Sequence, residues 1–297
     1  MWFKIYSINF VDLTMLKTYL TSFLLLSILL NTGCKSKIKQ QDDELYSRHL
    51  QRHVKLTIIN TPMPADKSQL NLLLLNDGQD MGQFRIKQIT DSLYSKGLIR
   101  PLLVVGIPAG DRMKEYGVGD HPDFKTRGDK AGKYDEFVYN ELYAFAKKKA
   151  GVRKFNSIVI AGCSLGGLSA FDIAWNHADR VDKVGVFSGS FWWRDKDDKA
   201  ADYADEKNRI MHNKIRSSKK RPHLEYWFYT GGKEEEGDRD KDGIIDVTDD
   251  TKDLIEIMKN KNILPGVIVH TEDVNGKHDY SAWSKQLPGF LIWAFGK

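Results

Sequence analysis

Cysteine is almost absent from the sequence, because only Cys34 and Cys163 occur among 297 residues. This excludes a framework of several disulfides, and Cys163 has no partner at all if Cys34 is modified. A chain of this length with 41% hydrophobic residues can build a sizeable core without such cross-links. We expect Cys163 to be a small buried hydrophobic side chain rather than a reactive thiol.

Three further features are missing. There is no basic cluster interleaved with aromatic residues, and the 45 basic and 40 acidic residues, net charge +5, are spread along the chain. This charge pattern gives no case for a nucleic-acid partner. Internal repeats are absent, and no apolar run reaches the roughly 20 residues that a membrane-spanning helix needs. The composition is that of an ordinary globular protein.

The longest apolar stretch, residues 19–30, follows Met15-Leu16-Lys17 and ends at Asn31-Thr32-Gly33-Cys34. A short apolar segment behind a positive charge, with a small residue before a cysteine, is typical of a bacterial lipoprotein signal. We interpret residues 1–34 as an export signal cleaved before Cys34, which then carries the lipid. Plain secretion or an uncleaved anchor is the alternative, because Asn31 stands where such sites usually have an aliphatic residue.

This interpretation sets the domain organisation. Residues 35–45 would be a polar tether, and residues 46–297 a single domain. The amino-terminal lipid would hold that domain on a membrane of the bacterial cell envelope, at the outer membrane or the periplasmic face. Met15 fits the start of such a signal better than Met1, so the start codon is left open.

From residue 54 onward, short apolar runs alternate with amphipathic segments. Runs of this kind favour buried strands, and a 3.6-residue apolar period favours helices. Alternation of the two is typical of an α/β fold, in which helices cover both faces of a mostly parallel sheet. We expect strands at 54–59, 70–75, 102–107, 157–161, 184–187, 226–229 and 267–270, and helices at 84–96, 134–149, 168–177, 251–260 and around 287–295.

The segment Gly162-Cys163-Ser164-Leu165-Gly166-Gly167 fits the G-x-S-x-G turn that presents a serine nucleophile between a strand and a helix. Its flanks agree, because an apolar β-branched run precedes it and a helical pattern follows. Glycines permit so tight a turn, where Cβ atoms would collide with the neighbouring strand and helix. We expect Ser164 to be a nucleophile and the backbone N–H of Leu165 to face the developing oxyanion. A glycine-rich loop without chemistry is the alternative.

A serine nucleophile needs a base, and in this architecture the chain order is serine, acid, histidine. His278 lies in the loop between the last predicted strand and the last predicted helix, where that base is expected. Its role would be to accept the Ser164 proton and to deliver it to the leaving alcohol. A solvent-exposed loop histidine is the alternative.

The acid should follow the strand predicted at 226–229, which opens into Gly231-Gly232-Lys233-Glu234-Glu235-Glu236. We choose Glu234 because it lies closest to the end of the strand, while Glu235, Glu236 and Asp238 remain alternatives. For the second oxyanion donor we choose the N–H of Gln79, in the Asn76-Asp77-Gly78-Gln79-Asp80 turn after an early strand. An ordinary Asp-Gly turn is the alternative there.

The segment beside the predicted acid reproduces nine positions of a calcium-binding D-x-D-x-D-G loop. The twelfth position carries Asp rather than the usual Glu, and no paired helix precedes the loop. We expect a structural Ca²⁺ site, with a solvated acidic loop as the alternative. No cofactor is expected for catalysis. The expected ligands are Asp238, Asp240, Asp242, Ile244, Asp246 and Asp249.

From about residue 46 to the end, the chain resembles the Putative esterase family of the α/β-hydrolase superfamily, which contains esterase D, enterobactin-type siderophore esterases and feruloyl esterase domains. The resemblance rests on Asp77-Gly78-Gln79, on GCSLGG with its helix, on Phe187-Ser188-Gly189-Ser190 and on GKHDYSAW. It implies an α/β-hydrolase fold and carries Ser164 and His278 over as nucleophile and base. The acid carries over less well, because family members often have Asp where this chain has Glu234.

Two further segments look like parts of a substrate pocket. The family-like stretch GDRMKEYG contains Arg112 and Glu115, which we expect at the pocket rim. Trp192 and Trp193 follow the Ser188-Gly189-Ser190 turn on the side where the site should open. Aromatic rings there could stack on a phenolic or sugar ring, or they could pack as part of a lid.

Taken together, the sequence predicts an exported serine esterase that hydrolyses a carboxylic ester through an acyl-enzyme. The resemblance is compatible with an acylated or feruloylated glycan and with a siderophore lactone, and no residue selects between these two substrates. An acyltransferase with the same triad is one alternative. A non-catalytic surface glycan-binding lipoprotein is the other.

Overall fold

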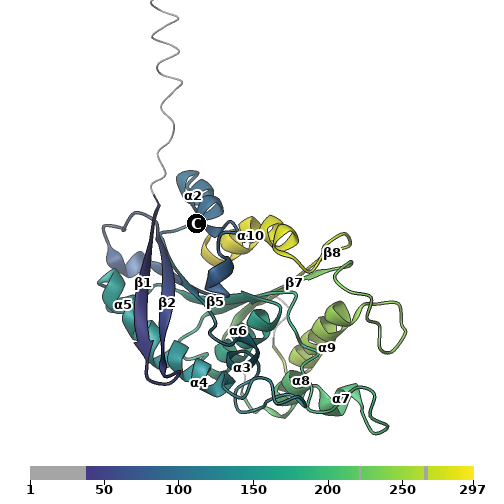
Figure 1. Ribbon diagram of the computed structural model, residues 1–297. Helices are drawn as coiled ribbons and strands as arrows, with labels where there is room; N and C mark the ends of the chain where they lie inside the picture. Colours follow the sequence, from purple (N-terminus) through teal and green to yellow (C-terminus); the bar gives the residue numbers. More distant parts are fainter. Residues whose placement is uncertain (1–37, 221, 264–266) are drawn as a thin grey trace, which may run out of the picture. The chain divides into compact units, whose positions relative to one another are not determined.

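The apolar runs of the sequence assemble into one eight-stranded sheet with the strand order β1-β2-β4-β3-β5-β6-β7-β8 (Figure 1). The computed structural model describes residues 38–220, 222–263 and 267–297. Strands β3 to β8 are parallel to one another, whereas β2 runs antiparallel to β4 and β1 runs antiparallel to β2. The strands are β1 (Lys39–Ser47), β2 (Arg52–Asn60), β3 (Asn71–Asn76), β4 (Leu102–Ile107), β5 (Ile158–Cys163), β6 (Lys183–Phe187), β7 (Glu225–Gly231) and β8 (Ile268–Asp273).

Strand β1 corrects one prediction. The tether expected at residues 35–45 is wrong from Lys39 onward, because Lys39–Ser47 pairs with Arg52–Asn60 along its whole length. The segment is polar because β1 is the edge strand and one face of the hairpin stays in water. The predicted export signal at 1–34 and the start of the predicted tether lie outside the described residues. None of the helices that the structure describes is long and apolar enough to cross a bilayer.

Helices cover both faces of the sheet, as the alternating pattern predicts (Figure 1). The period of two along each strand sends alternate side chains to opposite cores. On β3, Leu72 and Leu74 belong to one core, while Leu73 and Leu75 belong to the other. The second core is closed by α2 (Ile86–Ser95) and α10 (Tyr280–Phe295), and the first is closed mainly by α4 (Ala131–Glu136), α5 (Tyr143–Ala150), α6 (Leu165–Asn176), α8 (Ile210–Ser217) and α9 (Asp246–Asn260).

The predicted helix boundaries were approximate. The helix expected at 134–149 is built from α4, the π-helical segment η3 (Phe137–Leu142) and α5. Helices α9 and α10 begin earlier than predicted: the first residues of α9 are mostly polar, and α10 begins at Tyr280, before Pro288. The remaining short elements are η1 (Lys67–Gln69), η2 (Gly78–Asp80), α3 (Arg112–Glu115) and α7 (Asp205–Asn208).

Candidate active site

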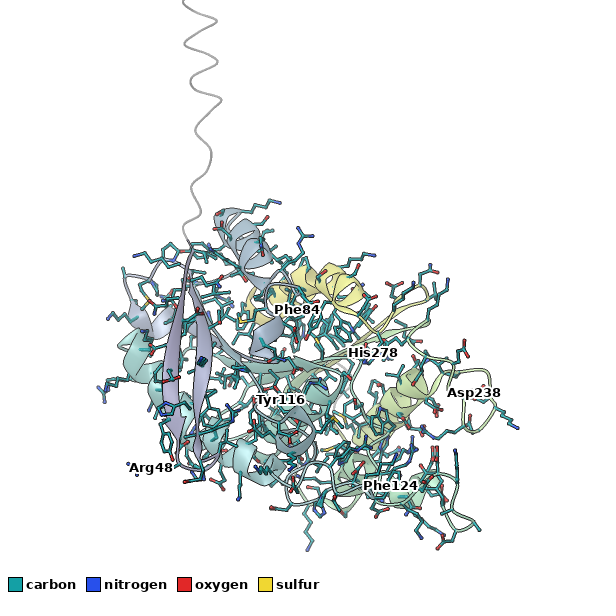
Figure 2. All side chains as sticks on the ribbon, in the orientation of Figure 1. Arg48, Phe84, Tyr116, Phe124, Asp238 and His278 are labelled. Atoms are coloured by element: carbon teal, nitrogen blue, oxygen red, sulfur yellow. The ribbon has the colours of Figure 1, made fainter. Side chains whose placement is uncertain are left out.

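The residues predicted to carry chemistry follow the carboxyl ends of neighbouring parallel strands. Gln79 follows β3, Ser164 follows β5, Glu234 follows β7 and His278 follows β8. These ends lie on the same edge of the sheet because the four strands are parallel members of it. Figure 2 shows His278 at this edge, beside α10.

Ser164 occupies a strained turn between β5 and α6. Its backbone has φ 54° and ψ −123°, a conformation that side chains rarely adopt. The flanking glycines are required by close backbone packing, because a Cβ on Gly162 would lie 2.3 Å from the Gly166 carbonyl oxygen. A Cβ on Gly166 would lie 2.6 Å from Asp77 Oδ2. The turn therefore has the geometry that the G-x-S-x-G pattern predicts.

The hydroxyl of Ser164 lies 3.3 Å from the hydroxyl oxygen of Ser190. No hydrogen bond joins Ser164 to His278 in the part of the chain that the structure describes. Such bonds are often long in unliganded hydrolases and tighten when substrate binds. The neighbouring Cys163 is buried, and burial raises the pKa of its thiol well above the usual value. It is therefore a packing residue, as expected.

Glu234 is the carboxylate that reaches His278. Its Oε2 lies 2.8 Å from His278 Nδ1, and the Glu234 side chain is fully buried while His278 remains 37% exposed. A carboxylate at Nδ1 favours the tautomer that carries its proton there, which leaves Nε2 free to accept a proton. The alternatives point elsewhere: Glu235 accepts a hydrogen bond from the Val247 N–H, and Asp238 belongs to the acidic loop.

Ser188 and the backbone of Gly231, which the sequence analysis did not select, hold Glu234 in place. The Ser188 hydroxyl donates to Glu234 Oε1 at 2.6 Å and accepts a hydrogen bond from Trp283 Nε1 at 2.8 Å. The Gly231 N–H donates to the same Oε1. The Trp283 ring also contacts the His278 ring edge-to-face, with centroids 5.1 Å apart. Ser188 was visible only as part of the Phe187-Ser188-Gly189-Ser190 resemblance.

The loops after β7 and β8 pack directly on each other through glycines. A Cβ on Gly231 would lie 2.5 Å from the Gly276 carbonyl oxygen, and one on Gly276 would lie 2.2 Å from the Tyr229 hydroxyl. The Lys233 N–H donates to the Gly276 carbonyl at 2.8 Å. This close approach brings the acid and the histidine together although 44 positions separate them in sequence.

The two backbone N–H groups predicted to bind the oxyanion have no acceptor among the residues that the structure describes. The N–H groups of Leu165 and Gln79 donate no hydrogen bond to any other residue that the structure describes. The turn holding Gln79 is rigid, because Asp77 adopts a left-handed conformation and a Cβ on Gly78 would lie 2.4 Å from the backbone of Gly106. Free, rigid N–H groups are suited to stabilising an oxyanion.

Arg112 is bound to Asp77 and is not a free side chain at the rim of a pocket. Its guanidinium donates to both carboxylate oxygens of Asp77, at 2.8 and 3.0 Å, and to the Cys163 carbonyl at 3.3 Å. Since Asp77 is buried, this bidentate pair fixes the turn of Gln79 against the serine turn. Glu115, also expected at the rim, is buried and pairs with Arg52.

The tryptophan prediction needs a correction. Trp193 is completely buried and its indole N–H donates to the His121 carbonyl, so it cannot stack on a substrate ring. Its ring lies against Gly117 and Gly128, where a Cβ would come within about 3 Å of it. Trp192 is half-buried and contacts the Arg127 guanidinium at 5.2 Å from the ring centroid. The segment is mainly packing.

The acidic loop gathers three of its six expected ligands. Carboxylate oxygens of Asp238, Asp240 and Asp242 lie within 4.8 Å of one another, and Gly243 has the positive φ of 91° that a sharp bend requires. Asp246 instead accepts from the Arg239 backbone and pairs with its guanidinium. Asp249 lies in the first turn of α9 and is not a member of this group of three carboxylates.

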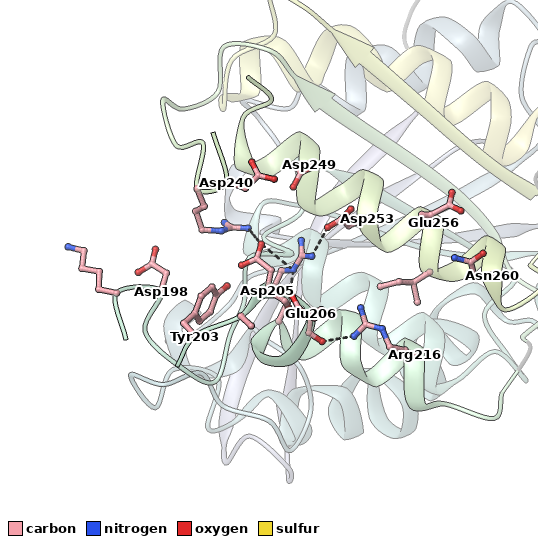
Figure 3. A pocket seen from close by; sticks show the side chains of 15 residues that line it. Asp198, Tyr203, Asp205, Glu206, Arg216, Asp240, Asp249, Asp253, Glu256 and Asn260 are labelled. Atoms are coloured by element: carbon pink, nitrogen blue, oxygen red, sulfur yellow. Dashed lines mark hydrogen bonds and ion pairs between the residues drawn. The ribbon is translucent and has the colours of Figure 1, made fainter. Parts of the chain in front are cut away.

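A pocket of about 780 Å³ lies next to this loop, bordered by α7, α8 and α9 (Figure 3). Asp240 and Asp249 line it, together with Arg209 and Arg239. Both arginines pair with the buried carboxylate of Asp250, which ties the acidic loop to α9. Neither Ser164 nor His278 borders this pocket, so its size does not make it the site of chemistry.

The sequence matches the family described as Putative esterase over residues 47–294. YbbA of Bacillus subtilis (strain 168) is 23% identical to this chain over 239 residues, which is 78% of this chain and 88% of YbbA. The family match spans all the loops that contribute to the site described above.

Solved structures with this fold include three hydrolases. The enterobactin esterase FES of Shigella flexneri is 20% identical with a TM-score of 0.66, and the alignment covers 86% of this chain and 58% of FES. A ferulic acid esterase is 17% identical with a TM-score of 0.64, covering 88% and 99% of the two chains. Siderophore hydrolase EstB of Aspergillus nidulans is 13% identical with a TM-score of 0.61, covering 87% and 95%. This chain thus spans less than two thirds of FES, and at these identities the likeness establishes the α/β-hydrolase fold.

Proposed function

The chain belongs to the Putative esterase family of carboxylic ester hydrolases, and from this premise we propose that it is a serine esterase acting through an acyl-enzyme. The observation that carries the proposal is the contact between Glu234 Oε2 and His278 Nδ1, 2.8 Å long, beside the strained turn of Ser164. An acid that orients a histidine near a partly exposed serine is the arrangement that activates a hydroxyl for acyl transfer.

In the first step, Ser164 Oγ attacks the carbonyl carbon of the ester and its proton moves to His278 Nε2. Glu234 stabilises the imidazolium that forms, while the N–H groups of Leu165 and Gln79 bind the oxyanion. The bond between the carbonyl carbon and the alcohol oxygen then breaks. The alcohol leaves with the proton from His278, and the acyl group stays on Ser164.

In the second step, water attacks the acyl-enzyme and gives its proton to His278. The bond between the acyl carbon and Ser164 Oγ breaks, Ser164 regains a proton and the carboxylic acid is released. An acyltransferase would differ only here, since a sugar or glycerol hydroxyl would replace the water.

Labelling with a fluorophosphonate probe tests the nucleophile directly. We expect the wild-type protein to be labelled and to hydrolyse p-nitrophenyl acetate, and Ser164→Ala to do neither. An unlabelled wild type would contradict the enzyme and favour the non-catalytic binding protein. Acyl transfer to added glycerol in excess over hydrolysis would instead favour the acyltransferase.

For the substrate we keep two proposals, an acylated or feruloylated glycan and a siderophore lactone. Solved relatives carry both descriptions, enterobactin esterase and ferulic acid esterase. A screen of feruloylated and acetylated glycans and a trilactone siderophore, with Ser164→Ala as the control, separates them.

We also propose that the acidic loop binds a structural Ca²⁺ ion. The grouped carboxylates of Asp238, Asp240 and Asp242 and the bend at Gly243 support this, because Ca²⁺ prefers several oxygen ligands in such a loop. We expect a chelator to lower the melting temperature of the wild type but not that of Asp240→Asn with Asp242→Asn. The same melting temperature and turnover with and without chelator would contradict the site.

Finally, we propose that the protein is exported and anchored to the bacterial envelope through a lipid on Cys34. The support is the apolar segment that ends at Gly33-Cys34. Metabolic labelling with an alkyne fatty acid should mark the wild type and not Cys34→Ala. Labelling of neither, together with release of the wild type into the medium, would favour plain secretion.

A further inference from the structure

A groove of about 730 Å³ lies between the β1–β2 hairpin and the turn that holds Gln79. Gly78 and Gln79 form one border, Pro108 and Ala109 form another, and the hairpin supplies the long wall. Gln79, whose N–H is an oxyanion donor in the proposed function, lines the groove, whereas Ser164 and His278 do not, so the groove would lead to the reacting carbonyl from the Gln79 side. A ligand in it would be continuous with a bound ester.

The borders of this groove are held rigidly. Arg52 donates to both oxygens of the buried Glu115, at 2.7 and 2.6 Å, and to the Pro108 carbonyl at 3.2 Å. Glu115 Oε2 also accepts from the Gly110 N–H at 2.9 Å. These bonds join the first residue of β2 to the loop after β4 and fix the hairpin against that loop.

The wall of the groove presents donors and acceptors in pairs. Thr57 Oγ1 donates at 3.0 Å to Asp42, its facing residue across the strands, and His53 Nδ1 lies 3.0 Å from Glu44, whose facing residue is Lys55. Lys55 stands between these pairs. From the Thr57 position to the His53 position the wall is about 13 Å long, at the rise of a β-strand.

The charges and the absence of certain side chains restrict the ligand. Arg52 is neutralised by Glu115 and Asp43 by Lys149, which leaves a nearly balanced set of charges in the groove. No Phe, Tyr or Trp lines it within the part of the chain that the structure describes. An anionic, aromatic group would find no net positive charge, and the His53 imidazole is the one ring among the described residues that line the groove.

We propose that this groove binds the carbohydrate part of the ester substrate, a neutral chain of sugars whose hydroxyl groups exchange hydrogen bonds with the hairpin wall. This inference rests on the proposed function, because it identifies the glycan ester, rather than the siderophore lactone, as the substrate of the Ser164 site. Paired donors and acceptors on a rigid wall match the hydroxyl groups of a sugar ring, each of which donates and accepts.

The test measures binding of unacylated sugars, which does not depend on ester hydrolysis. Isothermal titration calorimetry uses neutral hexasaccharides of xylose, glucose and N-acetylglucosamine, with 2,3-dihydroxy-N-benzoylserine as the anionic aromatic comparison. Thr57→Trp fills the groove, and Gln41→Trp places the same side chain at an exposed position of the hairpin outside it. A circular dichroism spectrum verifies that each variant folds.

We expect wild type and Gln41→Trp to bind at least one hexasaccharide with the same affinity, and Thr57→Trp to bind it at least tenfold more weakly. Binding of none of the three sugars, equal binding by Thr57→Trp, or stronger binding of the aromatic comparison would overturn the proposal. Hydrolysis of p-nitrophenyl acetate by wild type and its loss in Ser164→Ala report on the esterase separately. A protein that hydrolyses the small ester but binds no sugar therefore refutes the groove alone.

Discussion

The two carboxylate oxygens of Glu234 have separate partners. Oε2 contacts His278, and Oε1 accepts from Ser188 and from the Gly231 N–H. Because every bond is charge-assisted and the side chain is buried, the carboxylate has one orientation. Of the four acidic residues considered as partners of His278, Glu234 lies nearest the end of β7.

Replacement of Glu234 by Gln should therefore lower kcat for p-nitrophenyl acetate by about 10³-fold or more, since the amide cannot stabilise the imidazolium and favours the wrong tautomer. Glu236→Gln is the matched control, because Glu236 is exposed and two positions away. It should retain wild-type kcat. A larger loss in Glu236→Gln than in Glu234→Gln would assign the acid elsewhere.

In the proposed mechanism, Ser188 is a positioning residue that acts on the reaction through Glu234. Ser188→Ala removes one charge-assisted hydrogen bond and leaves the Trp283 indole N–H without its acceptor, so we expect kcat to fall about tenfold. Ser169→Ala is the control, since the hydroxyl of this buried serine bonds to the Gly117 backbone and to no other described residue. It should lower the melting temperature without lowering kcat. Equal kcat for both variants would contradict the role of Ser188.

Among the secondary-structure elements, the β1–β2 hairpin differs most from expectation. Strand β1 is rich in charge and carries few apolar residues, so its sequence resembles a tether. It forms because β2 is antiparallel to β4 and presents an unpaired edge that β1 covers. Asp43 additionally pairs with Lys149 of α5, and Leu45 packs against the core.

Deletion of residues 1–47 should consequently destabilise the domain relative to a variant that begins at Ile38 and keeps β1. Loss of β1 exposes the β2 edge and removes its packing, and we expect a melting temperature lower by about 5 °C or more, with a greater tendency to aggregate. Differential scanning fluorimetry and light scattering measure both effects. Identical behaviour of the two variants would mean that β1 contributes nothing to the fold.

At the scale of the whole molecule, the pH dependence of stability includes a buried ionisable side chain away from the site. His212 of α8 is completely buried, its Nε2 lies 2.8 Å from the Asp250 carbonyl, and burial together with Arg209 and Arg216 lowers its pKa to about 3. The folded protein thus keeps His212 neutral, while the unfolded chain protonates it near the ordinary pKa of about 6.5. The stabilisation is complete above that value and is lost as the pH falls toward 3.

We expect each pH unit of acidification in that window to cost about 1.4 kcal/mol of the free energy of unfolding through this residue. Urea titrations of wild type and His212→Asn between pH 7.5 and pH 4.5 measure the difference. The slope of stability against pH should be shallower in His212→Asn. Equal slopes would show that His212 does not couple folding to protonation.

The sequence by itself determined the sheet-and-helix alternation, the serine turn and the loop in which His278 lies. These features are local, because a β-branched apolar run, a helical period and a glycine pair constrain the backbone wherever they occur. The choice of Glu234 also followed from its distance to a strand end. The expected roles of the two tryptophans and of Arg112 did not have this local basis.

The tertiary structure alone decided which polar groups meet. Packing of Gly231 on Gly276 brings Glu234 to His278. Because β6 pairs with β7, Ser188 at the end of β6 reaches Glu234, and no local sequence pattern predicts this contact. Burial of Trp193 depends on loops far away in sequence. Strand β1 exists only because β2 offers an open edge. Contacts between distant segments depend on how closely the two backbones can approach and on which other segment each one packs against. No short stretch of the sequence determines either of these.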